Sequence, residues 1–199
     1  MAWASPRWRL LLVWALAAAL NACQTLAPPP AESWPQRRAL LQALHQFGFH
    51  GQLAAATGSE GFSATLNWQQ TDESTDAALF APLGMGAAHL FFDGAQLRFA
   101  IGDAPALEGD AARQAMVGLL GFEPPLASLH YWLLGVPDPR LPGQETLSDT
   151  QRLERLVQAD WQIDYANYES AGSGLLPGLI TLQRAGWRLK VRVSRWQLP

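Results

Sequence analysis

The stretch from Phe62 to Gln69 restricts the possible folds more than any other part of the chain. Its residues alternate strictly between apolar and polar, so Phe62, Leu66 and Trp68 share one side of an extended backbone. A period of two is the spacing of a β-strand, and a polar second face is typical of antiparallel sheets that meet water on one side. The stretch therefore predicts an antiparallel sheet with one apolar face.

Strands of this kind are expected in two groups, with helices before and between them. Helices are expected at 33–48, 110–121 and 124–135 from their capping residues and apolar stripes, with Asp110 as an N-cap and Gly48 as a helix end. The first strand is expected to begin at Phe49, and the others to cover 62–69, 77–80, 88–92, 96–101, 149–158, 161–168, 178–183 and 187–196. Polar residues 70–76 are expected to form a turn, and 136–148 a loop.

The order of these elements decides the fold class. It contains no parallel βαβ unit, and an antiparallel sheet must cover its apolar face with something. Three short helices cannot fully cover a sheet of about ten strands, so the sheet is expected to curve around its own apolar face. The expected fold is α+β and mainly β: an unclosed antiparallel β-barrel, covered by a lid of about three helices and enclosing an apolar cavity.

Composition limits the class of protein. The 199 residues carry a formal net charge of −3, which leaves no basic excess for binding nucleic acid. The single cysteine excludes a disulfide within the chain, so the fold depends on its hydrophobic core. No zinc-protease, nucleotide-binding or nucleophile-elbow motif is present, and the four histidines are scattered along the chain. We therefore expect no enzyme activity, no metal and no cofactor.

The N-terminal residues have the pattern of a secretory signal peptide. Arg7 and Arg9 precede an apolar run from Leu10 to Leu20, and no acidic residue occurs before Glu32. The run is far shorter than the roughly 20 apolar residues that cross a bilayer. The only cysteine of the chain follows at once. We expect a signal peptide over 1–22, a tether over 23–33 and one domain over 34–199; a free thiol placed there by chance is the alternative.

Leu20-Asn21-Ala22-Cys23 resembles the lipobox of bacterial lipoproteins, although Asn21 departs from the usual small or β-branched residue. The resemblance implies that Cys23 becomes residue one and carries three acyl chains, which would anchor the protein stably to lipid. Gln24 stands where an aspartate is the usual signal for retention in the inner membrane. The resemblance thus implies an anchor in the outer membrane, on its periplasmic face.

Several motifs, in the same order along the chain, resemble the family of the outer-membrane lipoprotein-insertion factor LolB. They are Trp68-Gln69-Gln70, Pro82-Leu83-Gly84, Pro125-Leu126 through Trp132-Leu133-Leu134-Gly135-Val136-Pro137, Trp161 with Tyr165 and Tyr168, Leu176-Pro177, and a basic last strand ending in Trp196. The resemblance implies the same open barrel with a helical lid. It also implies a monomer that accepts acylated lipoprotein cargo from the periplasmic carrier LolA and inserts it into the outer membrane.

The resemblance assigns roles to particular residues. In the family, the leucine of the Pro-Leu-Gly motif projects and is needed to place cargo in the membrane, which by position corresponds to Leu83 between Pro82 and Gly84. The alternative is that Leu83 folds back onto the sheet as a core residue. The residues expected to line an acyl-chain cavity all have apolar side chains and lie on the sheet or on the lid. They are Phe62, Leu66, Trp68, Leu119, Leu129, Trp132 and Leu133. Ordinary core packing would leave the same pattern.

Two other questions stay open on the sequence. Arg188, Lys190 and Arg192 form a basic stripe that is either a solvated or edge-protecting face, or a contact for phospholipid headgroups or the carrier. The alternative function is a structural envelope lipoprotein that binds a protein partner through its sheet edge. A lipid-modifying enzyme is the weakest hypothesis, because no nucleophile with an oriented base can be assembled.

Overall fold

The computed structural model describes residues 33–58, 60–82, 86–172 and 174–199. The predicted signal peptide, Cys23, nearly all of the tether, Leu83 and Gly84 lie outside these residues. The chain divides into two units, and the described residues belong to the second, Ser33–Pro199.

This unit is built on one antiparallel sheet of eleven strands. The first group is β1 Gln46–Thr57, β2 Glu60–Thr71, β3 Ser74–Phe80, β4 Ala87–Phe92, β5 Leu97–Ile101 and β6 Leu107–Glu108. The second group is β7 Gly143–Leu147, β8 Leu153–Gln158, β9 Trp161–Ala171, β10 Gly174–Arg184 and β11 Trp187–Gln197. Each group is a meander, and the pairing of β1 with β11 joins them into the order β6-β5-β4-β3-β2-β1-β11-β10-β9-β8-β7. The sheet remains open between β6 and β7, which confirms the predicted unclosed barrel.

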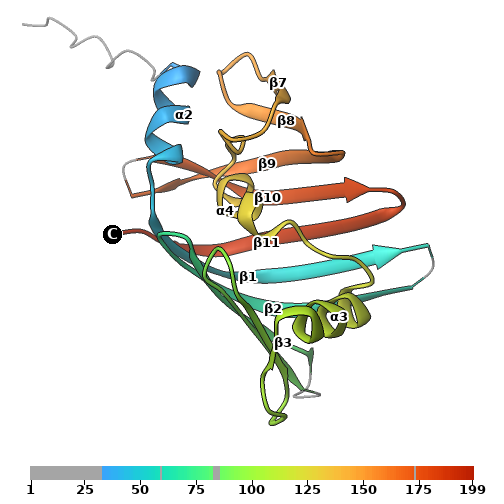
Figure 1. Ribbon diagram of the computed structural model, residues 1–199. Coiled ribbons are helices and arrows are strands. Elements are labelled where there is room, and N and C mark those ends of the chain that lie inside the picture. The colour runs from blue at the N-terminus through green and yellow to red at the C-terminus, as the bar shows by residue number, and fades with distance from the viewer. Residues whose placement is uncertain (1–32, 59, 83–85, 173) are drawn as a thin grey trace, which may run out of the picture. The chain divides into compact units, whose positions relative to one another are not determined.

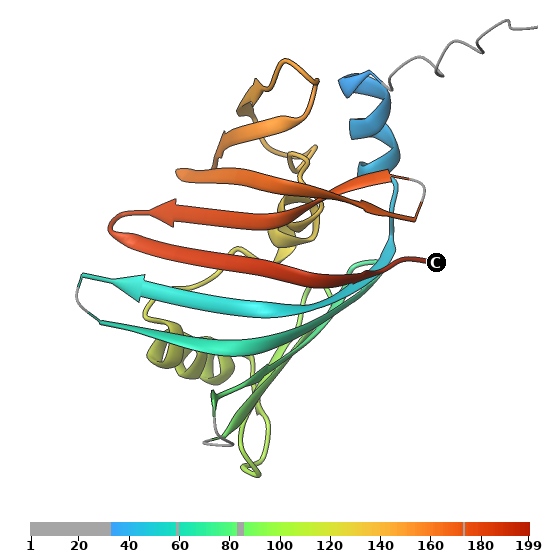
Figure 2. The same ribbon diagram turned by 180° about the vertical axis from the view of Figure 1, so that it is seen from behind.

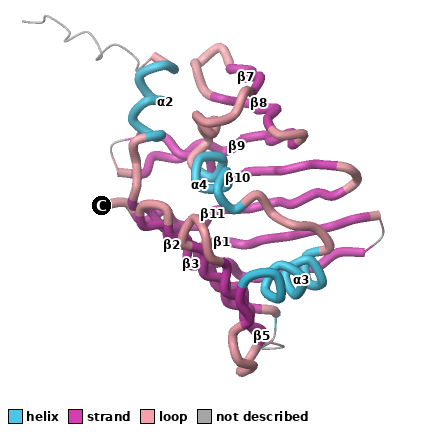
Figure 3. The backbone as a smooth tube through the Cα atoms, in the orientation of Figure 1, coloured by secondary structure: helices cyan, strands magenta, loops and turns pink. Residues whose placement is uncertain are grey.

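In the described part of the chain, three helices accompany the sheet: α2 Trp34–Gln42, α3 Gly109–Leu120 and α4 Leu126–Leu133. The sheet curves, and α3 and α4 lie on one of its faces (Figure 1). Seen from behind, the strands lie in front of these helices (Figure 2). The chain between β6 and β7 supplies both helices on that face, and Figure 3 shows α3 and α4 as two separate helices. The buried apolar residues form one core between this face and the helices.

The first helix is shorter than predicted. Its N-terminus is as expected, since Gln36 Oε1 accepts hydrogen bonds from the backbone N–H and the hydroxyl of Ser33, at 3.2 and 2.8 Å. It ends at Gln42, however, and Phe47 and Gly48 belong to β1. Phe47 lies three residues from Leu44 and two from Phe49, so it fits either period. Pairing with β2 decides the outcome, and Phe47 is buried in the sheet.

Other boundaries differ for related reasons. The predicted turn over 70–76 is only Asp72-Glu73, because the Thr75 hydroxyl bonds to Gln70 Oε1 at 2.8 Å and both side chains are buried in the strands despite being polar. Glu108, not Asp110, is the N-cap of α3, and Asp110 pairs instead with Arg113 at 2.9 Å. The short strand β7 lies within the expected loop 136–148, and the short strand β6 lies where no strand was predicted.

The basic stripe does not protect a sheet edge, which corrects one of the predicted alternatives. Arg188, Lys190 and Arg192 lie on β11, whose neighbours are β1 and β10. The strand is the last in sequence but is central in the sheet, because it pairs with β1, the first strand in sequence. All three side chains are exposed.

Candidate functional site: an apolar cavity beneath two helices

An apolar cavity of about 80 Å³ lies between the sheet and the helices. All of the described residues that line it are apolar. The sheet contributes Leu53, Leu66, Trp68, Ala77, Leu79, Leu90, Phe99, Leu182, Leu189 and Val191, and the helical side contributes Met116, Leu119, Leu120, Pro124, Leu126, Leu129 and Leu133. Cavities of about 150 Å³ with such linings stay dry and take up benzene. The present cavity is smaller, so a long alkyl chain can enter it only if part of the wall moves.

A larger hollow, of about 400 Å³, adjoins this cavity. It lies between β2, β3, β4 and the C-terminal part of α3, and it reaches Pro82 and Gly86, the described ends of the loop between β3 and β4. We call it the loop-side groove. Leu79 and Leu119 line both the groove and the cavity, so these two side chains separate them. Leu119 is 39% exposed. A displacement of Leu119 would therefore open the cavity into the groove.

The end of α4 is fixed to the sheet by polar contacts. Gln158 on β8 accepts hydrogen bonds from Trp132 Nε1 at 2.7 Å and from the backbone N–H of Asp138 at 2.9 Å. Its amide donates to the carbonyl oxygens of Asp138 and Leu141, at 3.0 and 2.8 Å. Ser128 on α4 donates to the Asp138 carboxylate at 2.9 Å. All of these bonds hold α4 and the segment after it as one rigid piece.

Asp138 is charged within this buried network. Burial would raise the pKa of its carboxyl group, but hydrogen bonds from Arg140 and Ser128 outweigh burial and hold the pKa below the ordinary value of 3.8. Arg140 Nη2 lies 2.9 Å from Asp138 Oδ2. The ion pair adds a charge-assisted bond at the end of α4.

Helix α3 is held differently. Among the described residues, its side-chain polar bonds join Arg113 to Asp110 of the same helix and to Glu123 just beyond it, at 2.9 and 3.4 Å. Its contact with the sheet is made by apolar side chains such as Ala112 and Met116, both fully buried. Gly118 has open space around it. We infer that α3, rather than α4, is the part of the wall that can move.

His130 on α4 gives a testable pH dependence. Its ring is buried and its Nε2 lies 3.1 Å from the carbonyl oxygen of Leu44; burial is the main cause that lowers its pKa below the ordinary 6.5. Below about pH 6.5, His130 is therefore protonated in the unfolded chain but stays neutral in the folded chain. The free energy of unfolding falls as the pH falls below about 6.5. One proton limits the slope to about 1.4 kcal/mol per pH unit.

We expect His130→Gln, which keeps a donor for Leu44, to remove this slope in urea unfolding between neutral pH and the acid side of 6.5. His89→Gln, at an exposed position, is the matched control and should keep the wild-type slope. An unchanged slope in His130→Gln would assign the effect to another group.

Trp68 is the cavity residue with a polar atom. Its indole N–H is buried and has no hydrogen-bond partner among the described residues. The ring stacks on Phe49, with the centroids 6.3 Å apart. A buried donor without a partner costs about 1–3 kcal/mol. Such a donor beside an apolar cavity suits a ligand that carries an acceptor, such as an ester or amide carbonyl.

The described residues contain no helix long and apolar enough to pass through a bilayer. Nor do three or more His, Cys, Asp or Glu side chains gather as a metal site in that part of the chain.

Comparison with known proteins identifies the family. Residues 45–196 match the family model described as outer membrane lipoprotein LolB. The chain belongs to the LolB family. It is 32% identical over 202 residues to the outer-membrane lipoprotein LolB of Cellvibrio japonicus, covering 96% of this chain and 98% of that one. It is 31% identical over 185 residues to that of Nitrosococcus oceani, covering 90% and 92%.

Solved structures agree with the fold. A LolA superfamily protein from Nitrosomonas europaea has a TM-score of 0.52 at 9% identity, covering 85% of this chain and 94% of its own. A DUF1329 family protein from Desulfovibrio piger has a TM-score of 0.55 at 6% identity, covering 83% and 90%. Membership of the LolB family gives this chain the function of lipoprotein insertion at the outer membrane. It does not favour the alternative of a structural envelope lipoprotein.

The structure sorts the residues that were expected to line a LolB cavity. Leu66, Trp68, Leu119, Leu129 and Leu133 come together around it. Phe62 lines the loop-side groove instead.

Trp132 belongs elsewhere in the core. It is fully buried, its ring centroid lies 6.3 Å from that of Trp161, and it bonds to Gln158. Sequence reasoning did not single out Leu53, although the alternation of β1 points it to the same face. Nothing local in the sequence marks Gln158 or Asp138 as members of a buried network.

The loop between β3 and β4, which is predicted to enter the membrane, is described only at its ends. The backbone N–H of Ala81 donates to the carbonyl oxygen of Gly86 at 2.9 Å, which closes the loop at its base. Pro82 is exposed. Leu83 and Gly84 lie outside the described residues, and the role of Leu83 stays a prediction.

Proposed function

We propose that the cavity receives the acyl chains of lipoproteins delivered by the soluble carrier LolA. The protein then releases them into the outer membrane, from its periplasmic face, where three acyl chains on Cys23 anchor it. The observation that carries this proposal is the cavity itself, which is lined only by apolar side chains beneath a helix held by apolar contacts. Fatty tails are the cargo chemistry that such a lining favours.

Transfer on this proposal needs no catalysis. Each methylene exposed to water costs about 0.8 kcal/mol, so chains should pass directly between the carrier, this cavity and the bilayer. The direction follows from rising affinity along that route. The small volume of the cavity supports an entry step in which α3 moves and the groove and cavity merge. The cavity then closes again as the chain leaves.

The most direct experiment is mass spectrometry of the mature protein purified from membranes. We expect the N-terminus to be Cys23 with three acyl chains, and acylated peptides to copurify with the folded protein. A mature chain with an unmodified Cys23 would contradict the proposed lipid anchor. The absence of any bound acyl compound in the purified protein would contradict the proposed acyl-chain cargo.

Leu83→Glu is expected to accept cargo but to fail in placing it. A carboxylate at an insertion loop must either enter the apolar layer charged or first take up a proton, and either route costs several kcal/mol. Insertion of a labelled lipoprotein into liposomes should therefore fall by roughly 10²-fold or more. Leu83→Ile is the matched control and should keep the rate. An insertion rate for Leu83→Glu equal to the wild type would mean that Leu83 does not enter the membrane.

A further inference from the structure

The cationic residues of the chain are unevenly distributed. Glu169 is the last acidic residue, and five cations follow it, although the whole chain has a net charge of −3. They are Arg184, Arg188, Lys190, Arg192 and Arg195. None of the five forms an ion pair with another described residue. The hairpin of β10 and β11 is thus a basic element of an acidic protein.

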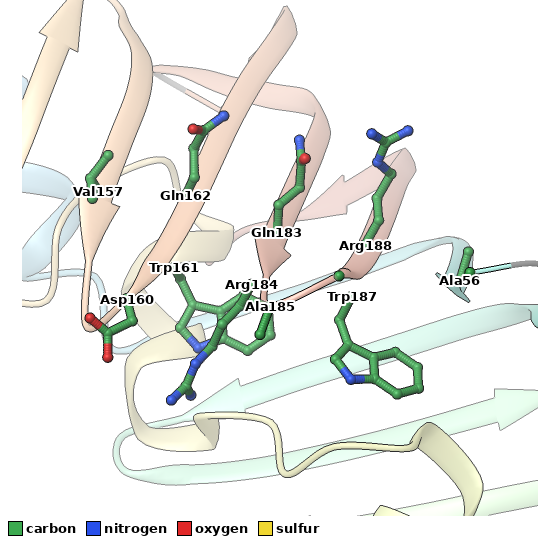
Figure 4. Close-up of a pocket in the computed structure, with 12 residues that line it drawn as sticks. Ala56, Val157, Asp160, Trp161, Gln162, Gln183, Arg184, Ala185, Trp187 and Arg188 are labelled. Carbon is green, nitrogen blue, oxygen red and sulfur yellow. The ribbon is translucent and has the colours of Figure 1, made fainter.

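The tip of this hairpin combines two guanidinium groups with an indole. Around the turn at Ala185-Gly186, Arg184 pairs with Trp187, and Gln183 pairs with Arg188. The two arginines are exposed, and Trp187 is half-buried. Figure 4 shows Arg188 on one face of the sheet and Arg184, with Trp187, on the other. The guanidinium groups therefore do not converge on one point.

A hollow of about 670 Å³ surrounds the tip. It extends from β11 to Ala56 and Gly58 at the end of β1 and to Asp160 in the turn between β8 and β9. On the inner side, the Arg184 guanidinium lies over the Trp161 ring, 5.8 Å from its centroid. Trp187 packs on Phe122, with the centroids 5.4 Å apart, and over Gly121, where a side chain would overlap its ring. These contacts hold the indole in place at the end of the sheet.

The same end of the sheet carries the loop between β3 and β4. In an antiparallel meander, alternate turns lie at the same end, and the turns after β1, β3, β8 and β10 share this one. Exposed apolar residues gather at the strand ends here: Phe80 is 40% exposed and Ile101 48%. This end of the sheet therefore carries an indole and arginines on the β10–β11 hairpin, and exposed apolar side chains on β3 and β5, three and five strands away.

We propose that the Arg184–Arg188 hairpin tip docks on the phosphate layer of the bilayer and holds this end of the sheet against the membrane. This docking proposal rests on the proposed function, because lipoprotein insertion requires the protein to face a bilayer. Guanidinium groups bind phosphates, and tryptophan prefers the headgroup region of membranes. Two arginines on opposite faces cannot share one phosphate, but both reach phosphates in a plane that the tip meets end-on. The exposed apolar side chains of Phe80 and Ile101 at the same end of the sheet suit a bilayer better than an acidic protein partner.

The test uses the lipidated mature protein in vesicles of phosphatidylethanolamine and phosphatidylglycerol that contain brominated lipids, which quench nearby indoles. The difference in quenching between wild type and Trp187→Phe isolates Trp187, and we expect a clear difference. A cation near an anionic surface stabilises binding about fivefold. The double variant Arg184→Gln/Arg188→Gln should therefore lower the ratio of docked to undocked tip roughly 25-fold. Lys190→Gln/Arg192→Gln removes the same charge from β11, farther from the tip, and should leave quenching unchanged.

Three results would overturn the docking proposal. One is the absence of quenching at Trp187, and another is an equal loss from both double variants. The third is normal quenching in Arg184→Gln/Arg188→Gln together with slower delivery from the carrier, which would assign the tip to an acidic protein.

Binding of a fluorescent fatty acid separates this proposal from the proposed function. The tip variants should bind it as the wild type does. If the wild type binds none while Trp187 is still quenched, the cavity hypothesis fails and the docking surface stands.

Discussion

Replacing Ala77 with leucine is expected to lower the affinity for a fluorescent fatty acid roughly fiftyfold. Ala77 lies on β3, is 6% exposed and lines the cavity. The three added carbons would occupy the space of about three methylenes of the ligand, at about 0.8 kcal/mol each. Together they remove about 2.4 kcal/mol of binding free energy, which gives the fiftyfold loss in a fluorescence titration.

The matched control is Ala54→Leu, the same substitution at an exposed position of β1. It should bind the fatty acid with the wild-type affinity. Because overpacking can itself destabilise a core by about 1–3 kcal/mol, thermal melting must show that Ala77→Leu is folded. Leu129→Trp fills the cavity from α4 and gives an independent second variant. If both bind fatty acid normally, acyl chains are held somewhere else.

The sequence could predict which residues face the interior, because that depends on local periodicity. The alternation of Phe62 to Gln69 correctly placed Leu66 and Trp68 on the inner face, and the stripe of α4 placed Leu129 and Leu133 there. It could not separate a cavity from a core. Trp132 lies on the same helix as Leu133 but is enclosed by Trp161 and Gln158. The volume of the cavity is a small difference between the space enclosed by the backbone and the volume of the side chains that fill it. The local pattern of apolar residues carries no information on that difference.

The sequence could not predict the pairing of strands that are far apart along the chain either. A basic last strand such as β11 is a reasonable candidate for a sheet edge, yet Leu53 of β1 pairs with Val191 and makes β11 central. The register between strands so far apart in sequence depends on the whole fold. The sequence therefore could not predict that Arg184 and Arg188 lie at an exposed hairpin tip without ion-pair partners among the described residues.

Gln158→Leu is expected to lower the free energy of unfolding by about 3–5 kcal/mol. Leucine has nearly the same volume, so the loss comes from hydrogen bonds rather than from packing. The substitution leaves Trp132 Nε1 and the backbone N–H and carbonyl of Asp138 without their partner in the buried interior. The urea midpoint measures the effect.

Gln162→Leu on the neighbouring strand β9 is the matched control, because the Gln162 side chain donates one hydrogen bond to a described residue, 2.9 Å to Asp164 Oδ2, and is half-buried. Its effect should stay within about 1 kcal/mol. Hydrogen exchange in Gln158→Leu should quicken first in α4, since that helix depends on the lost bonds, while α3 should be little changed. Similar small losses in both variants would mean that α4 is held mainly by its apolar side, as α3 is. The distinction between a fixed wall and a movable one would then disappear, and entry of acyl chains beneath α3 alone would lose its physical reason.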